Sequence, residues 1–266
     1  MNANDDDLRV DIRDGVAVLT MNRPARLNAL SPAMIAAGIA TLERCAGDPA
    51  IGCVVLTGAD KGFCAGGDVS AMAGGANAEA TLEQQVDRQR AIHRFSGLLY
   101  AMPKISIAAV NGACAGAGFG LALACDLRLA SDNAKFTTAF AKVGFSGDFG
   151  ITWPLLRTLG DAKARELLFL SEVLTAQQAL ELGLLNRVLP ADELIGAAME
   201  LAARIAKGPL LAYRYMKENL RHAATEDYAA LLDREGFTQR RCAVSADHKE
   251  GVAAFMAKRA PKFSGR

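Results

Sequence analysis

The stretch ISIAAVNGACAGAGFGLALACD, residues 105–126, passes from a β-rich run through a cluster of glycines into an apolar run. Residues 105–112 predict a buried strand, and Gly116, Gly118 and Gly120 lead into LALAC, which predicts a helix. A strand, a tight turn and a helix therefore follow one another. The N–H groups at the start of such a helix have no partner within the helix, so they can bind an anion or a developing oxyanion.

The first two-thirds of the chain alternate short β-rich runs with helical patterns. A second glycine cluster, GFCAGGDVSAM at residues 62–72, follows a predicted strand in the same way as the first. This alternation is typical of an α/β protein with largely parallel strand pairing. The predicted strands span residues 16–22, 52–58, 105–112 and 126–130. One predicted helix begins at Ser31-Pro32, and another spans residues 82–100.

The pattern changes near residue 195, after which strand signals disappear. Helical stretches are expected at about residues 192–207, 209–221 and 225–244, with a short one near 249–258 and a basic, mobile tail behind it. We therefore expect two parts, residues 1–195 and residues 196–266.

Composition excludes several classes of partner. The 266 residues are 51% hydrophobic and carry 30 basic and 29 acidic side chains, so no global charge favours nucleic acid or an anionic membrane. The six cysteines form no CxxC pair, and the three histidines are not spaced to build a metal site with them. The acidic start has no apolar core of a signal peptide, and no apolar run approaches the length of a membrane span. We expect a reduced, cytoplasmic, soluble protein.

The glycine clusters admit three interpretations. Glycines can serve close packing and positive φ angles alone. A dinucleotide site needs GxGxxG at the start of a helix, whereas residues 116–120 read GxGxG, and a Walker loop needs a GK pair followed by Ser or Thr, which the chain lacks. The third interpretation is a pair of half-sites, each of which donates one N–H to the same carbonyl oxygen.

Several linked motifs carry a family resemblance over residues 8–263. In their order and separations they resemble the crotonase, or enoyl-CoA hydratase/isomerase, superfamily. The resemblance implies an α/β fold, the crotonase (ClpP-like) spiral of ββα units, with a C-terminal helical region for oligomerisation. The motifs are FCAGGDVSAM, AAVNGACAGAGFGLALACDLRLAS, AKFTTAFAKVGFSGDFGITWPLLRTLG, LTAQQALELGLLNRVLP and HKEGVAAFMAKRAPKF.

The same resemblance implies a substrate and an oxyanion site. Members of the superfamily bind an acyl-CoA thioester without a prosthetic group, and two backbone N–H groups polarise its carbonyl. These map onto Gly67 and Ala117. Ala117 stands where glycine is commoner, which keeps the donor and narrows the space beside the thioester. Proton removal next to a thioester places enolate charge on the carbonyl oxygen, which such donors stabilise.

The residues that would hydrate a double bond are missing. Hydrating members carry two glutamates, and the matching positions here are Gly120 and Phe140. Asp148 lies eight residues after Phe140, where double-bond and ring isomerases of the superfamily, including 1,2-epoxyphenylacetyl-CoA isomerases, carry a catalytic aspartate. The segments AGAGFGLAL and AFAKVGFSGD also resemble that subgroup.

Asp148 is therefore the candidate proton shuttle of an isomerase, and its apolar neighbours would desolvate it. One carboxylate suffices to move a proton from one carbon to another. Three alternatives remain open: a hydratase that uses Asp148 or bound water, a non-catalytic CoA- or partner-binding protein, and a structural Asp148 that caps the helix running toward Arg157.

The resemblance also implies a CoA site and a homotrimer or homohexamer. A phenylalanine and a lysine of a neighbouring subunit's terminal helix map onto Phe255 and Lys258, whose spacing would place both on one helix face. Ser70 replaces a common CoA-contacting lysine. The remaining residues implied at the CoA site are Arg26 near the phosphates, Ala65, Gly66 and Val69 through their backbone, and Asp68 in support of the loop.

Four further residues near these motifs favour structural interpretations. Trp153 is interpreted as a core residue in preference to an acyl-pocket residue. His93 is interpreted as packed or solvated in preference to a residue at the acyl end. Cys64 and Cys114 lie near the glycine turns, but no cationic or basic neighbour lowers their thiol pKa, so we expect no catalysis through them.

Overall fold

A six-stranded sheet forms the centre of the protein in the computed structural model, which describes residues 7–68 and 80–265. The strand order is β1-β2-β3-β5-β7-β10, and only the β1/β2 pair is antiparallel. The predicted strands are confirmed, because β2, β3, β5 and β7 coincide with them. The strands are β1 Leu8–Arg13, β2 Val16–Met21, β3 Cys53–Gly58, β5 Ile105–Val110, β7 Leu127–Ser131 and β10 Arg187–Leu189.

A second, smaller sheet is built from strands that follow those of the first. Its order is β4-β6-β8-β9, with β4 Gly62–Cys64, β6 Ala113–Ala115, β8 Lys135–Thr137 and β9 Leu174–Thr175. Each repeat thus contributes one strand to each sheet and then a helix. The helices of the three repeats are α3 Leu82–Ala101, α4 Ala117–Ala124 and α5 Thr152–Leu170, which breaks at Gly160. The expected spiral of ββα units is confirmed.

Two glycines allow the chain to turn from the large sheet into the small one. A Cβ at Gly58 would lie 2.1 Å from the carbonyl oxygen of Gly62, and one at Gly112 would lie 2.0 Å from that of Lys61. The strand predicted over residues 105–112 therefore ends at Val110, and β6 begins at Ala113, directly after Gly112.

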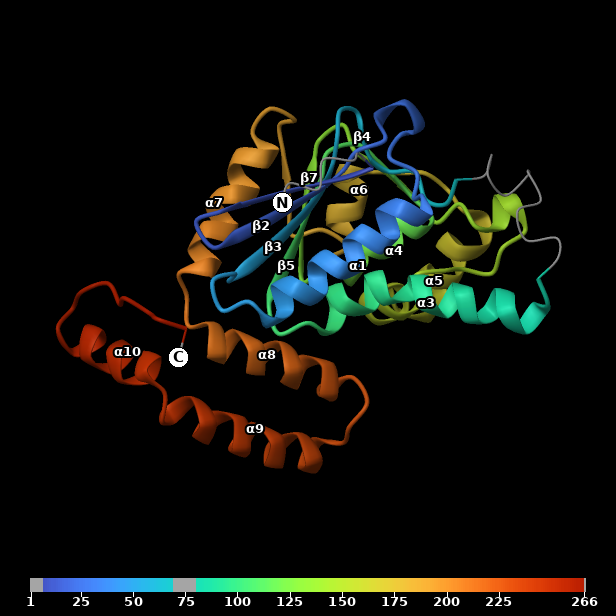
Figure 1. The fold of residues 1–266 in the computed structure, drawn as a ribbon. Helices are drawn as coiled ribbons and strands as arrows, with labels where there is room; N and C mark the ends of the chain where they lie inside the picture. The colour runs from blue at the N-terminus through green and yellow to red at the C-terminus, as the bar shows by residue number, and fades with distance from the viewer. Residues whose placement is uncertain (1–6, 69–79, 266) are drawn as a thin grey trace.

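Helices α1 and α3 lie side by side along one side of the sheet (Figure 1). α1, Pro32–Gly47, begins at the predicted Ser31-Pro32 pair, where Ser31 Oγ accepts the Met34 N–H at 3.0 Å. α3 begins at a capping box of Thr81 and Gln84. The largest fully buried side chains of the core are aromatic: Phe63, Phe95, Phe119 and Phe136.

The predicted C-terminal helices are confirmed to within a few residues. α7 covers a face of the large sheet, whereas α8, α9 and α10 extend away from it (Figure 1). Buried Lys217 ties α8 to the body, because its Nζ donates to Asp126 Oδ2 at 2.7 Å and to the Leu99 carbonyl at 2.8 Å. The helices are α6 Ala176–Glu181, α7 Leu194–Ala206, α8 Leu210–Ala223, α9 Tyr228–Ala243 and α10 Ala246–Met256.

The expected mobile tail is instead bound to α10. Asp247 Oδ1 accepts the Ser264 N–H at 2.6 Å, and Arg259 donates to Glu250 at 2.6 and 2.9 Å. The Arg259 guanidinium and the Lys262 N–H lower the pKa of Glu250 to about 2. Within residues 7–68 and 80–265, no helix is long and apolar enough to cross a membrane.

Gly118→Ala is expected to lower the free energy of unfolding by about 3 kcal/mol, because overpacking a rigid contact forces the backbone to shift. A Cβ at Gly118 would lie 2.3 Å from the Cys64 carbonyl oxygen and 2.6 Å from Cys64 Cβ. Gly196→Ala is the matched control, because that α7 glycine has open space around it. Urea unfolding followed by circular dichroism should show this control at or above wild-type stability, and equal stability of the two variants would contradict the packing argument.

Candidate functional site

The two glycine turns lie next to each other at one edge of the small sheet. β4 and β6 pair in parallel, with Cys64 opposite Cys114, so the turns leave their strands at the same end. Gly66 has φ +94°, and a Cβ there would lie 3.0 Å from the Ala115 oxygen and 3.4 Å from the Ala117 nitrogen. Only glycine fits this position, and the fit brings the first turn close to the start of α4.

The two predicted oxyanion donors, the backbone N–H groups of Gly67 and Ala117, lie at these turns. Ala117 is the first residue of α4 and follows Gly116, which has no side chain with which to cap the helix. Gly67 bridges to Leu30 in parallel, and that contact uses the Gly66 oxygen, which accepts the Leu30 N–H at 2.8 Å. The amide of Gly67 takes no part in this bond. The structure thus brings Gly67 and Ala117 onto adjoining turns.

The two cysteines beneath the turns, Cys64 and Cys114, are free thiols buried in the hydrophobic core. Burial raises the pKa of the Cys64 thiol to about 12 and raises that of the Cys114 thiol well above its ordinary value. Thiols in this environment stay protonated near neutral pH. This agrees with the expectation that neither acts as a nucleophile.

Asp148 lies on the loop before α5, and its carboxylate makes three polar contacts. Gln89 Nε2 donates to Oδ2 at 2.7 Å, the Phe149 N–H donates to Oδ1 at 2.9 Å, and His93 Nε2 makes a short contact with Oδ1. α5 begins after Ile151, whose apolar side chain cannot cap it. The Asp148 carboxylate accepts from Gln89 and the Phe149 N–H and from no N–H of α5, so the alternative in which Asp148 caps this helix is wrong.

Gln89 and His93 lie one turn apart on α3 and hold the carboxylate from the same side. His93 packs edge-on against Phe149, with ring centroids 5.6 Å apart, which agrees with its interpretation as a packed histidine. Its imidazole also contacts Asp148, which that interpretation did not include. Sequence analysis did not identify Gln89. The i, i+4 spacing of an amide and an imidazole on one helix face was the available signal.

The loop that carries Asp148 packs directly on Gly120 of α4. A Cβ at Gly120 would lie 3.0 Å from Phe149 Cβ, 3.2 Å from the Phe149 oxygen and 3.3 Å from the Asp148 oxygen. A longer side chain at this position would displace the loop. Phe140, the other position where a glutamate is absent, is 8% exposed, and its ring lies near Gly116.

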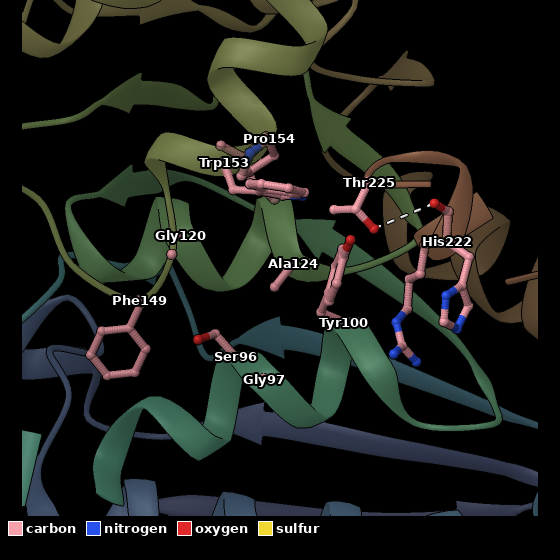
Figure 2. Close-up of a pocket in the computed structure, with 13 residues that line it drawn as sticks. Ser96, Gly97, Tyr100, Gly120, Ala124, Phe149, Trp153, Pro154, His222 and Thr225 are labelled. Carbon is pink, nitrogen blue, oxygen red and sulfur yellow. Dashed lines mark hydrogen bonds between the residues drawn. The ribbon is translucent and has the colours of Figure 1, made fainter. Parts of the chain in front are cut away.

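A mostly apolar pocket of about 370 Å³ opens beside Gly120. In Figure 2, Trp153 and Pro154 of α5 lie on one side of Gly120 and Ala124, and Ser96 and Tyr100 of α3 lie on the other. Trp153 is 42% exposed, so its interpretation as a core residue is wrong. The lining is Ser96, Gly97, Tyr100, Gly120, Leu123, Ala124, Phe149, Gly150, Trp153, Pro154, Arg221, His222 and Thr225.

Helix α4 connects the turns to this pocket through small residues. Ala117, Gly120 and Ala124 are spaced by three and four residues, so they share one face of the helix. An oxygen held at the Ala117 N–H would therefore have its attached chain directed along this face and into the pocket. The loop that carries Asp148 packs on the middle of this face, where the Asp148 carbonyl oxygen lies 3.3 Å from the Cβ position of Gly120. A general base carried by this loop would therefore be close to the acyl chain.

Residues implied at the CoA site cluster near the first turn. Arg26 is exposed at the end of a short helix, Pro24–Arg26, and the Ala65 N–H donates to the Leu27 oxygen at 2.9 Å. Asp68 Oδ2 accepts from Arg23 Nη2 at 2.9 Å, which fixes the turn. Val69 and Ser70 lie outside the described residues.

Phe255 and Lys258 are not brought to the turns of the same chain, since α10 lies in the projecting helical part (Figure 1). The expectation that they share a helix face is wrong. α10 ends at Met256, and Lys258 adopts φ +50°. The Arg259 N–H donates to the Ala254 oxygen at 3.0 Å and the Lys258 N–H to the Phe255 oxygen at 3.1 Å, which is a Schellman helix end. Phe255 itself is 82% exposed.

Comparison with known proteins relates the chain to one family along nearly its whole length. Residues 11–266 match the family described as enoyl-CoA hydratase/isomerase. A 1,2-epoxyphenylacetyl-CoA isomerase of Escherichia coli K12 is 39% identical, over 96% of this chain and 97% of the relative. A 2,3-dehydroadipyl-CoA hydratase of the same organism is 36% identical, over 98% of this chain and 99% of the relative.

Solved structures show the same fold. The crystal structure of an enoyl-CoA hydratase from Polaromonas sp. JS666 superposes with a TM-score of 0.91 at 36% identity, covering 96% of this chain and 98% of that one. The relatives thus include both isomerases and hydratases, and the chain's own site residues must distinguish the two reactions.

Proposed function

The chain belongs to the enoyl-CoA hydratase/isomerase family, and from this we propose that it is an acyl-CoA isomerase that moves a double bond or rearranges a ring through a thioester enolate. The observation that carries the proposal is the carboxylate of Asp148, held by Gln89 and the Phe149 N–H on the loop that packs on Gly120 of the pocket. Its substrate is an acyl-CoA thioester, and coenzyme A enters as part of that substrate.

In this mechanism the thioester oxygen accepts hydrogen bonds from the N–H groups of Gly67 and Ala117. Asp148 removes a proton from the carbon between the thioester carbonyl and the double bond, and the electron pair of the broken C–H bond delocalises onto the carbonyl oxygen to form a dienolate. The two N–H groups stabilise its charge because they are already oriented before the reaction. Asp148 then returns a proton to a different carbon, which leaves the mass of the substrate unchanged.

The residues around Asp148 support isomerisation over hydration. Addition of water by the usual route needs one group to activate water and another to deliver a proton. Gly120 and Phe140 can do neither, and the Asp148 loop occupies the space that a side chain at position 120 would need. A hydratase that used Asp148 or bound water instead is the alternative that the experiment below distinguishes.

The pocket supports a ring-containing acyl group as substrate. Trp153 and Tyr100 contribute flat aromatic surfaces to its lining, and its volume of about 370 Å³ accommodates a ring. The similarity to a relative named for a phenylacetyl-CoA derivative agrees with this choice. We accordingly propose a cytoplasmic role in the breakdown of aromatic or fatty acids.

The CoA moiety is proposed to lie along the first glycine turn, with a second subunit completing its site. Phe255 and Lys258 would contact the CoA of a neighbouring subunit in a homotrimer or homohexamer. Large exposed hydrophobic side chains on α8–α10 support such an interface, because a monomer rarely leaves so many uncovered. They include Leu220, Tyr228, Phe237, Val252, Phe255 and Met256.

The proposal is tested by following a 3-enoyl-CoA with the purified protein. We expect the ultraviolet absorbance of a conjugated 2-enoyl thioester to appear, with no change in mass by mass spectrometry. A ring-containing 3-enoyl-CoA should react with a higher kcat/KM than a straight-chain one of equal carbon number. Binding of acyl-CoA without turnover of either substrate would instead support a non-catalytic CoA-binding protein.

A further inference from the structure

The Asp148 carboxylate is in contact with a titratable side chain that the proposed reaction does not yet use. His93 Nε2 contacts Oδ1, while Gln89 holds Oδ2. The side chain of His93 is 40% exposed and that of Asp148 is 24% exposed. A substrate that contacts Asp148 would cover part of the exposed surface of this carboxylate. The His93 imidazole is then the group of the pair that is more open to water.

The geometry accommodates a proton on either partner. If Nε2 carries hydrogen, it donates to an ionised Asp148. If Asp148 carries the proton, its Oδ1–H donates to a bare Nε2, and the Gln89 amide keeps its hydrogen bond to Oδ2 at 2.7 Å. The three side chains therefore need not move when the proton crosses from carboxyl to imidazole.

We propose that His93 relays protons between Asp148 and solvent, an inference that rests on the proposed isomerase function. The C–H bond of the substrate breaks, its electron pair stays in the dienolate, and the proton forms an O–H bond at Asp148. With the imidazole in its Nδ1–H tautomer, the proton then passes from Oδ1 to the bare Nε2, and the resulting imidazolium releases its Nδ1 proton to water. The return step runs in reverse and takes its proton from water.

This relay makes His93 a positioning residue that acts through Asp148. The relay determines where the proton added to the product comes from, and this origin can be measured in the product. With the relay, the proton added to the product comes from solvent, because exchange occurs while the dienolate is held at the glycine turns. Without it, Asp148 returns the same proton that it removed.

The test is isomerisation of a 3-enoyl-CoA in D2O, with the deuterium content of the product measured by mass spectrometry at early turnover. Wild-type product is expected to contain deuterium in most molecules. In His93→Gln the side-chain amide can still donate to Asp148 but cannot carry an extra proton. The share of product that retains the substrate's own proton should rise by at least about fivefold, while isomerisation stays measurable.

Two matched variants separate relay from general disturbance. His248→Gln makes the same substitution at an exposed histidine of α10, and its product should match wild type. Gln89→Met removes the donor to Oδ2 and should lower kcat about tenfold, as expected for loss of a hydrogen bond to a charged group, with the deuterium share unchanged.

Either of two results overturns the relay: equal deuterium content in wild type and His93→Gln, or wild-type product that retains the substrate proton. In both cases the protein still isomerises, so the proposed function stands. Absence of isomerisation by the wild-type protein would instead remove the proposed function, and the relay with it.

Discussion

Asp148→Asn is expected to lower isomerisation of a 3-enoyl-CoA by about 10²- to 10⁴-fold, the usual contribution of a positioned general base. An amide cannot take up the substrate proton at neutral pH. The fold should be retained, because asparagine has nearly the same size and its carbonyl oxygen can still accept the Phe149 N–H that donates to Oδ1 at 2.9 Å. Thermal unfolding and steady-state kinetics measured on the same preparation check both statements.

Acyl-CoA binding by this variant separates chemistry from recognition. Calorimetric titration with a saturated acyl-CoA should give a Kd within about threefold of wild type. The base acts in the transition state and contributes little to binding that is equal in the ground and transition states. Asp161→Asn is the matched control: this aspartate of α5 pairs with Arg165 on the surface, so its loss should leave turnover unchanged. Full activity in Asp148→Asn would mean that another group is the base.

Ala117→Pro is expected to lower kcat/KM by about 10²- to 10³-fold, the cost of removing one oxyanion donor. Proline has no N–H, yet it is tolerated at the first position of a helix, which Ala117 occupies in α4. Gly116 precedes it with φ +52° and ψ −122°, outside the α region that a following proline disfavours. Circular dichroism should therefore show an unchanged fold.

Ala117→Gly is the control for this change, because it keeps the N–H and removes only a methyl group. Its kcat/KM should stay within about threefold of wild type, as for loss of a contact other than the oxyanion donor. If Ala117→Pro were as active as Ala117→Gly, the start of α4 would not hold the thioester oxygen, and the site would have to be placed elsewhere along the turns.

Much of the large sheet and its helices could be predicted from sequence, because their signals are local. Residues 53–56 form a continuous apolar run, and Ser31-Pro32 supplies both an N-cap and a helix-compatible first residue. The short strands of the small sheet could not be read in this way. β4, β6 and β8 have three residues each, too few to show a period, and their positions depend on close backbone approaches such as that of Gly112 to Lys61.

The candidate site was only partly predictable, because it too depends on contacts between segments that are distant in the sequence. Asp148 stands out in sequence as an isolated acid among glycines and aromatics, but its partners Gln89 and His93 lie 59 and 55 residues earlier on α3. No local pattern links these segments, since tertiary packing alone brings them together. Trp153 was misjudged because the pocket that exposes it forms only when α3, α4, α5 and the end of α8 converge.

The central claim is that one carboxylate makes this protein an isomerase and not a hydratase. The most direct test supplies a 3-enoyl-CoA and the matching 2-enoyl-CoA separately in H2¹⁸O and compares the initial rates of conjugation and of ¹⁸O incorporation by mass spectrometry. The account predicts rapid conjugation of the 3-enoyl substrate with no ¹⁸O gained by the 2-enoyl substrate. Rapid ¹⁸O incorporation into the 2-enoyl substrate would contradict it and show that water is activated despite Gly120 and Phe140.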